Sequence, residues 1–217
     1  MKNCVEFFHN VGKLKDIPRR GWILIGAKNP ASITDHSFRM AIMAWVLAKK
    51  KKKINFEKII KMALIHDLCE LYAGDITPYD YGHLPKNKKY WPKAFDKWPR
   101  FSQSEKIKNF LEKQKRERES LIKTTQGLAD DVKREIMHLW QEYDKGFSQE
   151  ARFVRQINRL ETLLQAFEYG EESKCRPFNS WWIGSEEHID DPILIECMKE
   201  VAERFYCSSN PKKKKKK

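Results

Sequence analysis

Apolar residues recur at helical spacing along most of this 217-residue chain, and no stretch shows the strict alternation that a β-strand needs. The pattern is clearest in residues 34–48, which begin with Thr34 and Asp35, two residues that commonly cap helices. The side chains expected to form the buried face of this helix are Phe38, Ala41, Ile42, Trp45 and Val46. The sequence therefore predicts an all-α fold.

Other segments carry the same signal. We expect a first helix over residues 5–15, with one face made by Val5, Phe8, Val11 and Leu14. A third helix begins after Asn55 and ends before Gly74, a residue suited to a left-handed cap. Further helices are expected over residues 104–124, 129–143, 149–169 and 192–206. The segment between the third helix and residue 104 is rich in proline, lysine and aromatic residues, and residues 81–104 are predicted to be an insertion or long loop.

The net charge of +13 is concentrated in two lysine runs. Lys49–Lys53 carry five of these charges and Lys212–Lys217 carry six, which leaves a nearly balanced body of +2. Solvated lysine runs usually serve solubility, and weak binding of RNA through its phosphates is the minor alternative. We expect a single domain over residues 1–207 and a disordered lysine-rich tail over residues 208–217.

Composition excludes several classes of protein. The longest apolar run, residues 41–48, is far shorter than the roughly 20 residues of a membrane span, and the N-terminal residues lack the apolar stretch of a secretory signal. The five cysteines form no CxxC pair, which argues against a disulfide framework and against a structural zinc cluster. We expect a soluble, cytoplasmic protein in which Cys69 is a small buried residue.

Several nitrogen and oxygen donors stand close together in the predicted helices. His36 opens the second helix, and His66, Asp67 and Glu70 lie within about one turn of each other in the third. Asp75 follows directly after the glycine cap. Such donors hold Mn²⁺, Co²⁺, Fe²⁺ or Mg²⁺ rather than thiolate-bound zinc. The alternative is a structural ion pair between His66 and Asp67 with His36 at the surface.

Several ordered motifs resemble one family. SITDHSFRM at residues 32–40, ALIHDLCE at 63–70 and GDITP at 74–78 are similar to the HD-domain 5′-deoxynucleotidases. The similarity extends to residues 12–15, 18–22, 139–143, 153–161 and 164–169, so that it covers most of residues 5–206. The GDITP motif and residues 18–22 favour this branch over related HD-domain enzymes that hydrolyse alarmones or cyclic nucleotides.

The resemblance implies an all-helical HD-domain bundle with a metal site between helices, which hydrolyses deoxyribonucleoside 5′-monophosphates to deoxynucleoside and phosphate. The residues that match metal ligands are His36, His66, Asp67 and Asn158. The residues that match catalytic positions are Glu70 and Asp75. The residues that match substrate-binding positions are Arg19 for the phosphate, Trp22 beside the sugar, and Asp75. The residues alone do not distinguish Arg19 from Arg20, and Trp22 suits a core position equally well.

One position departs from the family pattern. The last metal ligand of the family is an aspartate, and Asn158 stands there, followed by Glu161. An amide oxygen can coordinate a hard cation but brings no negative charge. Three outcomes follow: Asn158 acts as a neutral ligand, Glu161 takes its place, or the protein is a catalytically weakened member that binds nucleotide and metal.

The resemblance also implies a cofactor and partners. The cofactor is a divalent cation, with Mn²⁺ or Co²⁺ preferred and Mg²⁺, Fe²⁺ or Zn²⁺ as alternatives. The partners are a deoxynucleoside monophosphate and a second copy of the chain in a homodimer. No membrane partner is expected, and nucleic acid is expected only as weak binding by the lysine runs.

Overall fold

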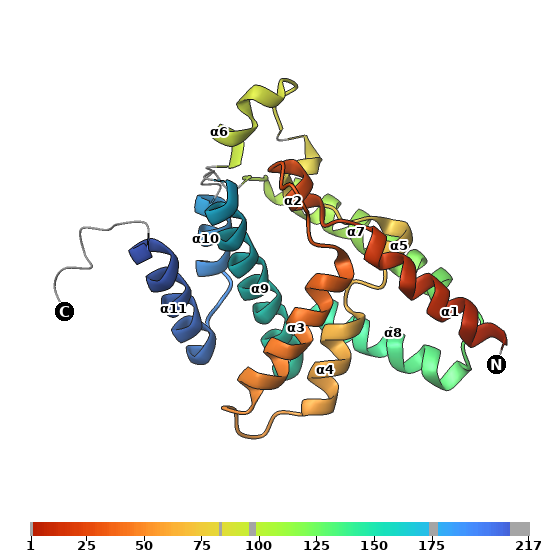
Figure 1. Ribbon diagram of the computed structural model, residues 1–217. Coiled ribbons are helices and arrows are strands. Elements are labelled where there is room, and N and C mark those ends of the chain that lie inside the picture. Colours follow the sequence, from red (N-terminus) through yellow and green to blue (C-terminus); the bar gives the residue numbers. More distant parts are fainter. Residues whose placement is uncertain (1, 83, 96–98, 174–177, 209–217) are drawn as a thin grey trace.

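The computed structural model describes residues 2–82, 84–95, 99–173 and 178–208, and within them it contains helices and no β-strand (Figure 1). The α-helices are α1 (Lys2–Lys13), α2 (Arg20–Leu24), α3 (Ile33–Ala48), α4 (Phe56–Ile65), α5 (Glu70–Ala73), α6 (Trp91–Phe95), α7 (Gln103–Thr124), α8 (Asp130–Lys145), α9 (Gln149–Ser173), α10 (Phe178–Glu186) and α11 (Pro192–Ser208). Short 3₁₀ turns are η1 (Leu14–Asp16), η2 (Pro78–Tyr81) and η3 (Lys88–Tyr90). The predicted all-α fold is confirmed, and the tail over residues 209–217 lies outside the described residues.

The main core lies between α3, α4 and α9, which pack against one another near the centre of the molecule (Figure 1). α8 packs against both α4 and α9, while α10 and α11 lie against α9. The fully buried side chains of this core include Met40, Ala44, Ile59, Met62 and Ile157. α1 lies across α5 and α7 on the other side and closes a smaller core around Leu14 and Trp140. Both cores meet at the segment that joins α4 to α5.

The face of α3 predicted to be buried is the wrong one. Ser32 accepts a hydrogen bond from the Asp35 N–H, and the helix extends to Ala48 as expected. Phe38, Ile42, Trp45 and Val46 are nevertheless 42–67% exposed, and only Ala41 of the predicted set is buried. The buried face instead carries Ile33, His36, Met40, Ala41, Ala44 and Ala48. Its small residues allow α4 and α9 to approach α3 closely, and helical spacing alone does not distinguish two apolar faces.

Ala44 gives a test of this close packing. Its side chain is fully buried in the core between α3, α4 and α9. Ala44→Leu should lower the free energy of unfolding by about 1–3 kcal/mol, because a well-packed core has no room for three further carbon atoms. Urea denaturation followed by circular dichroism measures this change. Trp45→Leu on the exposed face of the same helix is the control, and an equal loss in both variants would contradict this packing.

Two other predicted helices differ in detail. In α1, Val5 and Phe8 are 67% and 65% exposed, whereas Phe7 and Val11 pack on the smaller core. The helix after Asn55 does not run unbroken to Gly74, because α4 ends at Ile65 and a turn over residues 66–69 precedes α5. Gly74 has the expected positive φ of 75°, but its ψ of 153° is extended rather than left-handed helical. The break moves Asp67 off a regular helical face.

The described part of residues 81–104, a segment predicted to be an insertion or long loop, is more ordered than a loop. It contains η3 and α6, and Phe95 of α6 is buried against Tyr79 and Leu24. The sequence also failed to predict α10, which packs against both α6 and α9. Its nine residues are fewer than the 11–18 residues over which helical periodicity can be recognised. These two helices form one end of the molecule together with α2 (Figure 1).

The first lysine run is partly structural rather than wholly solvated. Lys51 forms an ion pair with Asp191, and its ammonium group lies 4.7 Å from the centroid of the Phe153 ring. Its side chain is only 15% exposed, so it joins the α3–α4 turn to the start of α11. Among the described helices, none combines the length and apolar character needed to cross a bilayer. Cys69 is buried as predicted, and burial raises the pKa of its thiol.

Candidate metal centre and active site

The fold brings His36, His66 and Asp67 together. His36 lies one turn inside α3, and His66 and Asp67 follow directly after the last residue of α4. One ligand atom from each residue lies within 4.8 Å of the other two. Asp67 Oδ2 is 3.0 Å from His66 Nε2 and 3.8 Å from His36 Nε2. The three side chains therefore point at a common position between α3 and α4.

The two imidazole rings are arranged as metal ligands are. The Nδ1 atom of His66 donates to the Ala63 carbonyl over 2.9 Å, and the Nδ1 atom of His36 contacts the Glu161 carboxylate. With their protons on Nδ1, both rings present a lone pair at Nε2. Among the described residues, both Nε2 atoms are buried without a hydrogen-bond partner. Buried polar atoms are rarely left so, and this donor set fits a divalent cation.

Glu161 orients His36 from behind. Its carboxylate contacts His36 Nδ1 and also accepts from Arg39, with Arg39 Nη2 at 2.7 Å and Nε at 2.9 Å. Burial opposes the charge, but His36 and Arg39 outweigh it and lower the pKa of Glu161 to about 2. The Glu161 carboxylate is therefore paired with His36 and Arg39 on the Nδ1 side of the His36 ring, away from Nε2. This geometry gives no support to Glu161 as a substitute for the missing aspartate ligand.

Glu161→Gln should weaken binding of Mn²⁺ about 10- to 100-fold, because a second partner of a ligating histidine sets its tautomer and its basicity. Isothermal titration of metal-free protein measures this affinity. The matched control is Glu168→Gln, since Glu168 also pairs with Arg39, at 2.7 Å, but is 39% exposed and does not contact His36. An unchanged affinity in the Glu161 variant would show that His36 needs no such partner.

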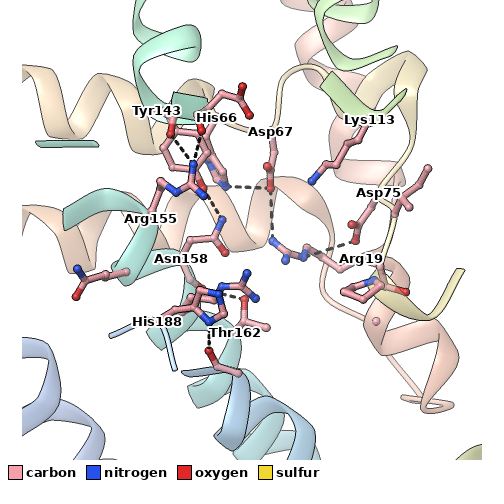
Figure 2. A pocket seen from close by; sticks show the side chains of 18 of the residues that line it. Arg19, His66, Asp67, Asp75, Lys113, Tyr143, Arg155, Asn158, Thr162 and His188 are labelled. Carbon is pink, nitrogen blue, oxygen red and sulfur yellow. Dashed lines mark hydrogen bonds and ion pairs between the residues drawn. The ribbon is translucent and has the colours of Figure 1, made fainter. Parts of the chain in front are cut away.

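Asn158 of α9 lies on the same side of the cavity as His66 and Tyr143 (Figure 2). Its amide Nδ2 donates to the Tyr143 hydroxyl over 2.8 Å, and the Tyr143 ring packs edge-on against His66 with centroids 5.2 Å apart. Burial and the nearby charge of Asp67 raise the pKa of Tyr143, so the phenol stays neutral. Tyr143 thus holds the amide of Asn158 beside His66. The Oδ1 atom of Asn158 remains available to coordinate a cation.

Arg19 lies between two carboxylates, as Figure 2 shows. Its Nη1 is 3.4 Å from Asp67 Oδ2, and its Nε is 3.8 Å from Asp75 Oδ2. Burial opposes the charge of Arg19, but Asp75, Asp67 and Glu70 outweigh it and raise its pKa. Arg20 turns away to Asp80 at 2.9 Å, and only its main-chain N–H contacts the site, donating to Asp75 over 2.7 Å. The structure therefore separates the two arginines that the residues alone left equivalent.

Glu70 and Lys113 complete the charged part of the cavity. Glu70 is 6% exposed, and burial together with Asp67 and Asp75 raises its pKa well above the usual value. Lys113 of α7 points toward Asp67 and Arg19 (Figure 2), with Nζ 3.4 Å from Glu117 Oε1. Burial opposes its charge, but Glu117 and Glu70 outweigh it and raise its pKa. No sequence pattern distinguishes Lys113, because an equally spaced pair, Lys108 with Glu112, lies at the surface of the same helix.

One cavity of about 650 Å³ is lined by Arg19, Glu70 and Lys113, among others. Its polar part contains His66, Asp67 and Asn158, and its aromatic part contains Trp22 and Trp181. Trp22 is only 3% exposed, stacked on Trp181 and edge-on to Tyr169. Trp22 is thus mainly a core residue, and it also reaches the cavity wall. The structure is therefore compatible with both interpretations of Trp22, as a core side chain and as a residue beside the sugar.

The comparison with known proteins agrees with this geometry. A family model described as HD domain matches residues 11–194, a span that contains every predicted site residue. The chain belongs to the HD domain family. The HD domain here is 32% identical to the human 5′-deoxynucleotidase HDDC2 over 205 residues, which are 94% of this chain and 87% of that protein. It is 29% identical to the 5′-deoxynucleotidase hdd1 of Schizosaccharomyces pombe, covering 97% of this chain and 96% of the relative.

Solved structures show the same HD domain architecture. The PH0347 protein from Pyrococcus horikoshii OT3 is 30% identical and superposes with a TM-score of 0.66 over 91% of this chain and 97% of its own. A protein from Magnetospirillum magnetotacticum described as a predicted metal-dependent phosphohydrolase is 26% identical, with a TM-score of 0.57 over 77% of this chain and 72% of its own. The donor set formed here by His36, His66 and Asp67 could likewise hold a metal ion.

Proposed function

We propose that this HD domain protein is a metal-dependent 5′-deoxynucleotidase, which hydrolyses deoxyribonucleoside 5′-monophosphates to deoxynucleoside and phosphate. One observation carries the proposal: two buried Nε2 atoms without a hydrogen-bond partner face the Asp67 carboxylate, and Arg19 is paired with that same carboxylate. A donor set for a cation next to an oriented guanidinium is what a phosphate monoester requires. The names of the relatives point to the same reaction.

The residues divide the work of holding the cation. His36, His66 and Asp67 would bind it through Nε2, Nε2 and a carboxylate oxygen, and Asn158 would add its neutral Oδ1. When bound, a divalent cation acidifies a coordinated water and neutralises charge on the phosphate oxygens. Without the aspartate of the family, this chain supplies one negative charge fewer. We therefore expect weaker metal binding than in a member that keeps the aspartate.

Other side chains act on the substrate and on the proton. Arg19 would bind the phosphate through its planar guanidinium, and Asp75 holds that guanidinium in place. Glu70 would accept the proton of the attacking water, since a raised pKa brings a carboxylate closer to the pH at which a general base is most effective. Trp22 would limit the space beside the sugar.

The finer features of the proposal rest on general chemistry. We propose Mn²⁺ or Co²⁺ as the metal, because the site offers imidazole and oxygen donors and no thiolate within the described residues. We propose a homodimer, because a stripe of exposed apolar side chains on α3 offers a face that a second copy can cover; the stripe consists of Phe38, Ile42, Trp45 and Val46. A single domain over residues 1–207 and a cytoplasmic location, which free cysteines such as Cys69 favour, complete the proposal.

Phosphate release from a panel of deoxyribonucleoside and ribonucleoside monophosphates, with Mn²⁺, Co²⁺ or Mg²⁺, tests the function. We expect deoxy-selective turnover by the wild type and none by Asp67→Asn, which removes the charge of the ligand without changing its shape. No release by the wild type from any monophosphate, with any of these metals, would contradict the proposal.

Asn158 favours a second candidate, a protein that binds nucleotide and metal without turnover. The distinguishing result is tight binding of dAMP by a silent wild type, together with activity in Asn158→Asp. Such a result would mean that the scaffold is intact and that the chemistry depends on the missing carboxylate.

A further inference from the structure

Four aromatic side chains that line the cavity pack against one another, and one of these four is not fully enclosed. Trp22, Tyr79 and Phe95 line the cavity but are 3%, 5% and 3% exposed. Trp181 of α10 lines it too and is only partly buried. An indole that is partly enclosed by other rings and partly exposed at a cavity wall is suited to contact a flat ligand.

The neighbours of Trp181 hold it in one orientation. Trp22 lies nearly parallel to it, with centroids 5.7 Å apart and an interplanar angle of 17°. The ring centroid of Phe95 lies 6.3 Å from that of Trp181. Phe95 also packs edge-on to Tyr79, with centroids 5.0 Å apart. Phe95 belongs to the insertion, so the inserted segment supports the indole from outside the main helical core. A ring held in this way binds a flat ligand with little further loss of side-chain freedom.

Trp181 also lies close to the segment of chain that carries Arg19. A Cβ atom added to Gly21 would lie 3.7 Å from Trp181 Cζ2. Gly21 is two residues beyond Arg19, and consecutive Cα atoms are about 3.8 Å apart. The indole therefore contacts the same short helix that presents Arg19 to the site. Arg19 and Trp181 line the same cavity, which is the space that a bound nucleotide would occupy.

We propose that Trp181 stacks on the nucleobase of the substrate, and that Phe95 of the insertion is a positioning residue for it. This inference rests on the proposed function, because it assigns the base-binding part of the same site. Stacking on an indole accepts every base, since each base has a flat π-face. The proposal thus predicts that the site recognises a nucleobase, with little preference for one base over another.

The test compares dAMP with 2-deoxyribose 5-phosphate, which keeps the sugar and phosphate but has no base. Wild type should have a lower KM for dAMP than for the abasic compound. Trp181→Leu should raise the KM for dAMP about tenfold or more, because the variant loses the binding free energy of one base–aromatic stack. The decisive quantity is the ratio of the KM for the abasic compound to the KM for dAMP, which should fall about tenfold in Trp181→Leu, because the abasic compound has no base to stack. Trp181→Phe keeps a stacking ring and should restore most of the difference.

The matched control is Trp182→Leu, which removes the neighbouring tryptophan of the same helix. Trp182 packs on Phe167, with centroids 6.4 Å apart, and does not line the cavity. Equal losses for both substrates in Trp181→Leu, or no change with dAMP, would overturn the proposal. If wild type turns over neither compound, the proposed function fails. Calorimetric binding of the same two compounds to wild type and Trp181→Leu still decides the stacking question.

Discussion

Asn158→Asp should tighten binding of Mn²⁺ about tenfold or more, because it offers the cation a charged carboxylate in place of a neutral amide. The substitution adds a negative charge beside Asp67 and His66, where the wild type offers a neutral amide. The hydroxyl of Tyr143 accepts from the amide of Asn158 and can turn to donate to a carboxylate, so the contact is kept. Titration of metal-free protein with Mn²⁺ measures the change in affinity.

The control for Asn158→Asp is Gln149→Glu, which adds the same charge at the exposed first residue of α9. It should leave the metal affinity nearly unchanged, because solvent and salt screen a distant surface charge. Equal tightening in both variants would mean that only net charge matters. No tightening in Asn158→Asp would mean that position 158 does not contact the cation.

Arg19→Ala should lower kcat/KM for a deoxynucleoside monophosphate about 10²- to 10³-fold, the usual cost of removing one oriented donor to a developing charge. The matched control is Arg20→Ala, because Arg20 has the same charge, is the next residue and pairs with Asp80 near the surface. It should change kcat/KM by less than about threefold, in line with the small value of exposed ion pairs. Steady-state phosphate release measures both variants.

Two further measurements show whether Arg19 acts on the phosphate. Arg19→Lys keeps the charge but loses the planar fork, so we expect only partial recovery of kcat/KM. Arg19→Ala removes a cation 3.4 Å from Asp67, so its affinity for Mn²⁺ should equal or exceed that of wild type. A parallel loss of metal affinity and of activity would instead indicate that Arg19 supports the metal site.

The sequence by itself determined the helical character of the chain and pointed to His36, His66 and Asp67, which the structure brings together. Asp35 and Asn55 were predicted as local capping residues, and the structure uses both at the starts of α3 and α4; the N-cap of α3 is Ser32, however, and not Thr34. His66 and Asp67 are adjacent in the chain, so their proximity needs no tertiary information. These features depend on interactions within a few residues, which is why periodicity and motif spacing are sufficient to predict them.

Only the tertiary structure decided which side of each helix is buried and how the site is completed. The small residues of α3 face the core because α4 and α9 approach there, although the larger apolar side chains on the other face gave the stronger pattern. Glu161 reaches His36 across 125 residues of sequence, and Lys113 and Trp181 enter the cavity from helices that carry no predicted site residue. Such contacts depend on the relative placement of whole helices, and no local pattern of residues encodes that placement.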